Sequence, residues 1–149
     1  MHKGYIKVLF THDSFEDGLE GAWAKKVGDA YMLDNILFYA KEFSWGDIIS
    51  IKEIDGENYV DELIKESGHS TVRVLFKSED IVQRVRTELR ALGCSSEMSN
   101  YNKLISVDIP PEVKYYIVRH FLTSGESLDK WEYQEACIST QHNLENKEE

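Results

Sequence analysis

The stretch HSTVRVLFKSEDIVQRVRTELRALG, residues 69–93, decides the fold class. Within it, Val72, Val74 and Phe76 recur at every second position, which is the period of a β-strand. After Ser78, which can cap a helix, apolar residues recur at helical spacing to the end of the stretch. The stretch therefore predicts a strand followed directly by a helix.

The elements predicted downstream continue this pattern. Alternating apolar residues favour strands over 94–98, 103–109 and 130–138, and residues 112–123 carry apolar positions at helical spacing after Pro110-Pro111. The order strand, helix, strand, strand, helix, strand matches the ferredoxin-like arrangement, in which both helices cover one face of a four-stranded sheet. The other face must then be covered by the rest of the chain, by a partner or by water.

The first seventy residues have a different character. Short apolar runs alternate with tight turns, and the Gly28-Asp29 and Asp55-Gly56 dipeptides are typical of β-hairpins. The runs that favour strands are 5–10, 19–27, 30–33 and 48–54. No long helical pattern is present in this part of the sequence, which indicates a small barrel.

We therefore predict an α+β protein with two subdomains and a tail. A small β-barrel-like subdomain over 1–68 packs on a ferredoxin-like βαββαβ subdomain over 69–139. Residues 140–149 are polar and negatively charged, which predicts a disordered tail.

Charge narrows the choice of partners. The chain has 17 basic and 27 acidic residues, a net charge of -10 and a pI near 5.0. Nucleic-acid binding requires a basic surface, and the outward positions of the two central strands offer Thr71, Arg73, Ser106 and Asp108 instead of the aromatic residues that stack on RNA bases. We expect a basic protein partner and no nucleic acid. Without an apolar run of membrane-spanning length or a signal peptide, we also expect no membrane association and a cytoplasmic location.

Catalytic and metal-binding signatures are weak. The five histidines and two cysteines have no metal-ligand spacing, and no phosphate-binding loop or GxSxG motif occurs, so we predict no metal, no cofactor and no enzymatic activity. His69 beside Ser70 and Thr71 is the one catalytic candidate, but catalytic groups are normally assembled from separated segments. Gly68 and its neighbours are better interpreted as a junction between the subdomains.

The segment 53–66 is the most acidic part of the sequence. Its six carboxylates are opposed there by Lys65 alone, and they are Glu53, Asp55, Glu57, Asp61, Glu62 and Glu66. Such a run keeps a surface soluble, or it forms an acidic docking surface with exposed aromatic residues such as Tyr59, Trp45 or Tyr101 as anchors. We predict Glu57, Tyr59, Asp61 and Glu62 as the partner-binding residues.

Several short motifs in a fixed order resemble a known family. They are Trp23-Ala24, Leu33-Asp34-Asn35-Ile36, Gly46-Asp47, Gly68-His69-Ser70-Thr71, Leu92-Gly93-Cys94 and Trp131-Glu132-Tyr133. Together they span the chain from Trp23 to Cys137 and resemble the bacterial family called "domain of unknown function 4265". The family implies no agreed activity, although small acidic families of this kind include immunity proteins of bacterial toxin systems.

The function predicted from charge and resemblance is a bacterial immunity protein. It would bind a toxic effector domain, such as a basic nuclease, and block its active site. One alternative is a small enzyme or ligand-binding domain with a site between the subdomains near His69, Arg73 and Asp34. Another is a regulatory module that binds a housekeeping protein. The sequence gives no prediction of the oligomeric state.

Overall fold

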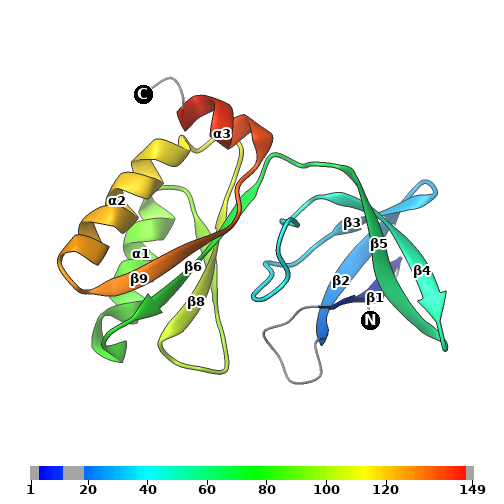
Figure 1. The fold of residues 1–149 in the computed structure, drawn as a ribbon, viewed down its shortest axis with the longest axis horizontal. Helices are drawn as coiled ribbons and strands as arrows, with labels where there is room; N and C mark the ends of the chain where they lie inside the picture. The colour runs from blue at the N-terminus through cyan, green and yellow to red at the C-terminus, as the bar shows by residue number, and fades with distance from the viewer. Residues whose placement is uncertain (1–3, 12–18, 147–149) are drawn as a thin grey trace.

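The computed structural model describes residues 4–11 and 19–146. They form a mixed α+β protein with a five-stranded and a four-stranded sheet and three α-helices (Figure 1). No helix in these two ranges is long and apolar enough to cross a membrane.

The N-terminal half is a closed barrel of five strands. These are β1 (Tyr5–Thr11), β2 (Leu19–Val27), β3 (Ala30–Leu33), β4 (Ile48–Ile54) and β5 (Glu57–Lys65). Successive strands pair antiparallel, and the barrel closes where Leu9 of β1 pairs in parallel with Tyr59 of β5. The alternating apolar side chains point inward, and Val8, Leu33 and Ile49 at the centre of this core are fully buried.

The C-terminal half is an antiparallel sheet with strand order β7-β8-β6-β9. Its strands are β6 (Ser70–Phe76), β7 (Ser95–Met98), β8 (Leu104–Ile109) and β9 (Trp131–Cys137), and α1 (Val82–Ala91) and α2 (Tyr115–Ser127) pack on one face (Figure 1). A 3-10 turn precedes α1, and the Ser78 hydroxyl caps this turn by accepting a hydrogen bond from Asp80 N. The helix-facing side chains of β6 and β8, including Val72 and Ile105, form the second core.

The prediction of a disordered tail over 140–149 is wrong for its first seven residues. They form α3 (Thr140–Asn146), and residues 147–149 lie outside the described residues. The Glu66 carboxylate accepts hydrogen bonds from N and Oγ1 of Thr140, at 3.1 and 2.7 Å. His142, two residues further on, is fully buried. These polar residues are ordered by partners that lie far away in the sequence, so local composition did not reveal the helix.

The central part of the second face of the C-terminal sheet is covered by the loop 34–47, which joins β3 to β4 and lies between the two halves (Figure 1). Ser106 Oγ donates a hydrogen bond to Leu37 O, and the hydroxyls of Ser44 and Thr71 are 2.8 Å apart. The covered face is therefore buried but polar. This contact makes the junction between the halves the natural place to look for a site.

Candidate functional site

The hairpin of β4 and β5 carries a dense group of acidic side chains, which we call the acidic hairpin. It consists of the exposed residues Glu53, Asp55, Glu57, Asp61 and Glu62. Asp55 and Gly56 both have positive φ, 54° and 81°, which is the backbone that a two-residue Asp-Gly hairpin turn requires. Glu66, the sixth carboxylate of the acidic segment, is bonded to Thr140 instead.

All four residues predicted to bind a partner lie on this hairpin. Glu57 pairs with Ile54, and Tyr59 with Lys52, so these side chains share one face of the hairpin. Asp61 lies next to them, 3.9 Å from Lys52 Nζ. Tyr59 is half-buried, whereas the other three are exposed. Of the three aromatic residues named as anchors, only Tyr59 belongs to this surface.

Asp61 and Glu62 lie at a β-bulge in β5. The pairing shifts from Ile51 with Val60 to Ile49 with Leu63, so that Asp61 and Glu62 together face one residue of β4. Leu63 and Ile64, which follow them in β5, are 40% and 57% accessible, and Ile54, at the turn of the hairpin, is 46% accessible. The hairpin thus combines five carboxylates with apolar area that water contacts.

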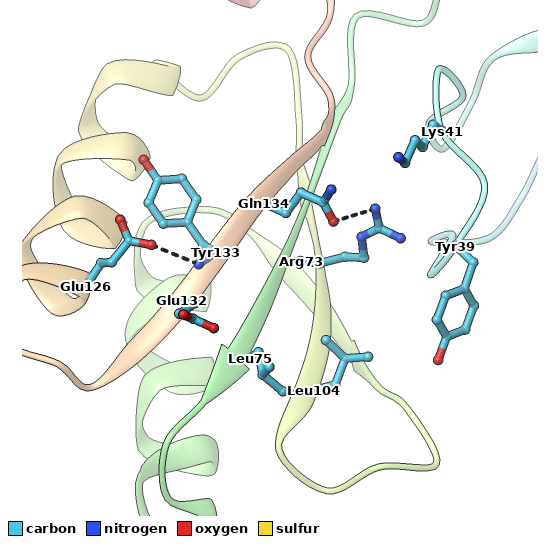
Figure 2. A pocket seen from close by; sticks show the side chains of 9 residues that line it. All are labelled: Tyr39, Lys41, Arg73, Leu75, Leu104, Glu126, Glu132, Tyr133 and Gln134. Atoms are coloured by element: carbon cyan, nitrogen blue, oxygen red, sulfur yellow. Dashed lines mark hydrogen bonds between the residues drawn. The ribbon is translucent and has the colours of Figure 1, made fainter. Parts of the chain in front are cut away.

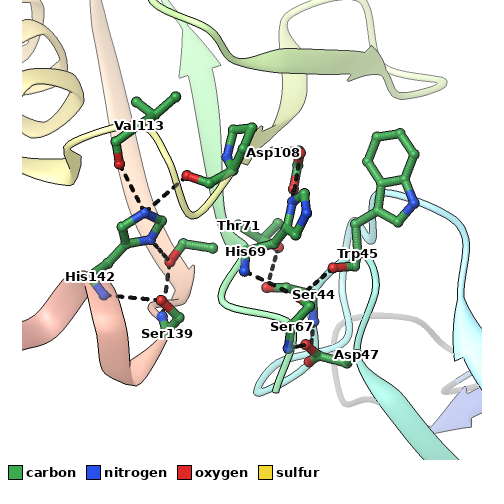
Figure 3. Close-up of polar contacts among 12 residues, drawn as sticks. Ser44, Trp45, Asp47, Ser67, His69, Thr71, Asp108, Val113, Ser139 and His142 are labelled. Atoms are coloured by element: carbon green, nitrogen blue, oxygen red, sulfur yellow. Dashed lines mark hydrogen bonds and ion pairs between the residues drawn. The ribbon is translucent and has the colours of Figure 1, made fainter. Parts of the chain in front are cut away.

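The residues named for a ligand site are divided between two places. His69 and Asp34 meet through Trp45, whose indole Nε1 donates to Asp34 Oδ1 at 3.0 Å and whose rings lie 6.1 Å from the His69 ring. His69 Nδ1 lies 2.8 Å from the carboxylate of Asp108 (Figure 3). Arg73, two positions further along the same face of β6 than Thr71, lines a separate cleft.

The His69 cluster has the features of a structural junction. Asp108 is almost completely buried, and within the described part of the chain the His69 ring hydrogen-bonds only this carboxylate. The neighbouring Ser70 hydroxyl points away, to the buried His142 ring. Asp47 accepts hydrogen bonds from Ser44 N and Ser67 N, which fastens the loop to the chain just before β6 (Figure 3). In the ranges that the structure describes, the one hydroxyl bonded to His69 is that of Ser67, which accepts from the His69 backbone N–H and donates to Trp45 O, as expected of a structural contact.

The His69–Asp108 pair is expected to make stability depend on pH. The hydrogen bond to Asp108 raises the pKa of His69, against the opposing effect of partial burial, and the negative charges of Asp108, Glu112 and Asp47 add to the rise. The pKa of His69 in the folded state therefore lies above its unfolded value of about 6.5. The stabilisation that the His69–Asp108 pair gives the folded state is complete below about pH 6.5, and it is lost as the pH rises through the folded-state pKa. We expect the free energy of unfolding, measured by urea titration, to fall over this window, and His69→Gln to reduce the fall.

His120 supplies the control for that measurement, because it is exposed on α2. His120→Gln should leave the pH dependence as in the wild type. A pH dependence that is the same in the wild type and in His69→Gln would show that the pair does not couple protonation to folding.

The cleft at Arg73 has a volume of about 620 Å³ and lies where β6, β8 and β9 meet the loop 34–47 (Figure 2). Arg73 is 7% exposed, and its Nη atoms donate to Phe38 O and to Gln134 Oε1. Burial lowers the pKa of the Arg73 guanidinium, and the nearby negative charge of Glu20 opposes this effect. Sequence reasoning named Arg73 but missed Lys41 and Gln134, which line the same cleft.

No group of three or more metal-ligating side chains converges within the described residues. Cys94 and Cys137 are both free thiols, and burial raises the pKa of Cys94 to about 12. A thiol with such a pKa carries no thiolate near neutral pH and is an unreactive core side chain.

A comparison with known protein families shows to which family this chain belongs. Residues 20–133 match the family described as "Domain of unknown function (DUF4265)". The chain belongs to this family. The resemblance predicted from its short motifs is therefore confirmed. The matched residues of this DUF4265 protein include the acidic hairpin, the His69 cluster and Arg73, and they end before α3.

A solved structure shares the fold of this DUF4265 protein. It is described as "Novel crystal structure of a hypothetical protein from Neisseria gonorrhoeae", and it matches with a TM-score of 0.72 and 20% sequence identity. The similarity covers 89% of this chain and 94% of the other. No curated protein matches the sequence.

Proposed function

We propose that this DUF4265 protein is a bacterial immunity protein that binds a basic toxic effector domain, such as a nuclease, and blocks its active site. The observation that supports this proposal is the acidic hairpin, where five exposed carboxylates are accompanied by Lys52 and Lys65 as the only basic residues of β4 and β5. A basic active-site groove that binds phosphates is complementary in sign to such a surface. The mechanism needs no catalytic step.

The two kinds of side chain on the hairpin would have different roles. Carboxylates of Asp61 and Glu62 would take the places of substrate phosphates and would speed association by attracting a basic domain. Ile54 and Ile64, which are about half exposed, would supply apolar contact area. The same negative charge would repel nucleic acid, so the protein would compete with the substrate without binding it.

We also infer how the fold divides into subdomains and where in the cell the protein acts. The strand order β7-β8-β6-β9 with two crossing helices supports a ferredoxin-like subdomain over 69–139, packed on the barrel over 1–68. A cytoplasmic location is part of the proposal, because an inhibitor of a nuclease must act where the nucleic acid lies.

Charge reversal on the bulge tests the proposed function. We expect Asp61→Lys combined with Glu62→Lys to weaken binding by about 100-fold or more, since each reversal replaces an attraction with a repulsion of about 1.5 kcal/mol or more. The tagged protein would be purified from its native cells at moderate salt, its bound protein identified by mass spectrometry, and the affinity of the purified pair measured by calorimetry. The bound protein should be basic, and its toxic activity should disappear on adding the wild-type chain.

The matched control is Glu88→Lys combined with Glu97→Lys. Both residues are exposed in the C-terminal half, on α1 and β7, and the net charge changes by the same amount. Equal loss of binding in the two double variants would mean that only overall charge matters. Recovery of the wild-type protein without a basic partner would contradict the proposed function.

A further inference from the structure

The cleft at Arg73 contains a buried donor without a partner. Among the described residues, Arg73 Nε is buried and makes no hydrogen bond, although both Nη atoms do. A buried N–H without an acceptor costs free energy, and such groups are rare in folded proteins unless a ligand or water supplies the acceptor. The side chain extends from β6 toward Tyr39 and Lys41 of the loop 34–47 (Figure 2).

The contacts of Arg73 with the protein leave its charge without a direct counter-ion. No described carboxylate lies within 4 Å of the guanidinium. Glu20 acts on it from a greater distance, because the Glu20 carboxylate is held by the backbone N–H groups of residues 38, 39 and 40, at 2.7 to 3.0 Å. A purely structural role, tying the loop to the sheet, accounts for the two Nη bonds and leaves Nε–H unexplained.

The remaining charges divide the cleft into two ends. Lys41 lines the cleft beside Arg73 and forms no ion pair with a described residue. On the opposite side, Glu126 accepts a hydrogen bond from Tyr133 N at 3.3 Å, and Glu132 lies 3.9 Å from Lys77 Nζ (Figure 2). The acidic side chains therefore have partners of their own. The two cations near the loop remain available.

Part of the cleft wall is apolar. Leu75 and Leu104, adjacent across β6 and β8, form one part of the lining, and the ring of Tyr39 forms another. A cleft of this volume falls in the range of small-molecule sites, which combine apolar walls with a few polar groups that orient the ligand. The glutamates on the far side disfavour a ligand with a second negative charge, which argues for a carboxylate instead of a phosphate.

We propose that this cleft binds a small carboxylate with an apolar or aromatic body. The carboxylate accepts hydrogen bonds from Arg73 Nε and Lys41 Nζ, and the body lies against Leu75, Leu104 and Tyr39. A planar carboxylate matches the edge of a guanidinium group, and such charge-assisted hydrogen bonds are stronger than neutral ones. This inference goes beyond the proposed immunity function and does not involve the acidic hairpin.

The test uses phenylacetate as the probe and the neutral phenylacetamide as its uncharged counterpart. The full chain, labelled with nitrogen-15 and carbon-13, would be titrated with each compound while the Nε–H resonance of Arg73 and the leucine methyl resonances are followed by NMR. We expect phenylacetate to shift this resonance and the methyl resonances of Leu75 and Leu104 in a saturable manner. Phenylacetamide should produce little or no shift at the same concentrations.

Variants of Lys41 test the proposed contact between Lys41 Nζ and the ligand carboxylate. They leave Arg73 in place, because its loss would remove the hydrogen bonds to Phe38 O and Gln134 Oε1. Lys41→Ala should lower the affinity for phenylacetate about tenfold, the value of one charge-assisted hydrogen bond. Lys26→Ala, at an exposed position of β2 in the barrel, should leave the affinity unchanged. The proposal is overturned if phenylacetate leaves the Arg73 Nε–H resonance unshifted, if both compounds shift it equally, or if the two lysine variants bind alike.

Discussion

Replacing Gly125 by alanine is expected to lower the free energy of unfolding by about 2 kcal/mol or more. In an ordinary helix interior this change would stabilise the protein by about 1 kcal/mol. Here a Cβ atom at position 125 of α2 would lie 1.9 Å from Cζ2 of Trp131, a distance that requires the ring or the helix to move. The ring is 3% exposed, meets the Phe76 ring edge to face and the Phe121 ring at a tilt, and donates Nε1–H to Leu122 O. Overpacking costs about 1 to 3 kcal/mol, occasionally more, and a contact this short with a buried ring lies at or above the upper end of that range, so the clash outweighs the gain in helix propensity.

Chemical denaturation of Gly125→Ala and the wild type measures this effect. Ser124→Ala, at the preceding exposed position of the same helix, is the control and should change stability by about 0.5 kcal/mol or less. An alanine at 125 that left the midpoint of unfolding unchanged would show that α2 and β9 can separate without cost, contrary to the packing described above.

Replacing His142 by alanine is expected to lower the free energy of unfolding by about 3 kcal/mol. The ring is fully buried, and Nε2 lies 3.1 Å from both Pro110 O and Val113 O, so it carries the proton. Nδ1 accepts from the Ser70 hydroxyl, which in turn accepts from Ser139 N. Alanine would leave a cavity and remove partners from buried polar groups, and the two effects add.

Thermal and urea unfolding would measure the loss, and Asn143→Ala is the neighbouring control because its side chain is exposed. Circular dichroism and the NMR spectrum of the folded state would report whether α3 detaches while the two cores remain. A variant at 142 as stable as the wild type would mean that the buried His142 ring and its hydrogen bonds contribute nothing to the fold.

The parts of the fold that the sequence predicted best have local causes. The hairpin over 19–27 and 30–33 and the strands over 48–54 and 70–76 occur with the predicted bounds, because side-chain alternation and Gly or Asp-Gly turns are determined within a few residues. The first residue of α2 was placed three positions too early, at 112, since the polar turn after Pro110-Pro111 is not yet helical. The exposure of Glu57, Asp61 and Glu62 was also predictable from their charge.

What the sequence could not reveal depends on contacts between distant residues. Ser106 reaches Leu37 across 69 positions, Ser70 reaches His142 across 72, and Arg73 reaches Gln134 across 61. One signal was available in retrospect. Thr71 pairs with Asp108 and Arg73 with Ser106, so polar residues oppose each other on both central strands at positions away from the helices. That pattern predicts a polar face on the sheet, and the structure shows that the loop 34–47 packs against it.

The polar contact between the loop 34–47 and the sheet of β6 and β8 affects how the two halves of the molecule can move apart. If the loop 34–47 lifts from the sheet, water can satisfy the exposed hydroxyl and charged groups, while the barrel and the sheet each keep their own apolar core. Separation should therefore be the large opening of the molecule with the lowest free-energy cost, with Gly68, at a φ of 94°, as the pivot in the segment that connects β5 to β6. A molecule held between Arg73 and Lys41 touches both sides of this opening, and it would fix the angle between the halves.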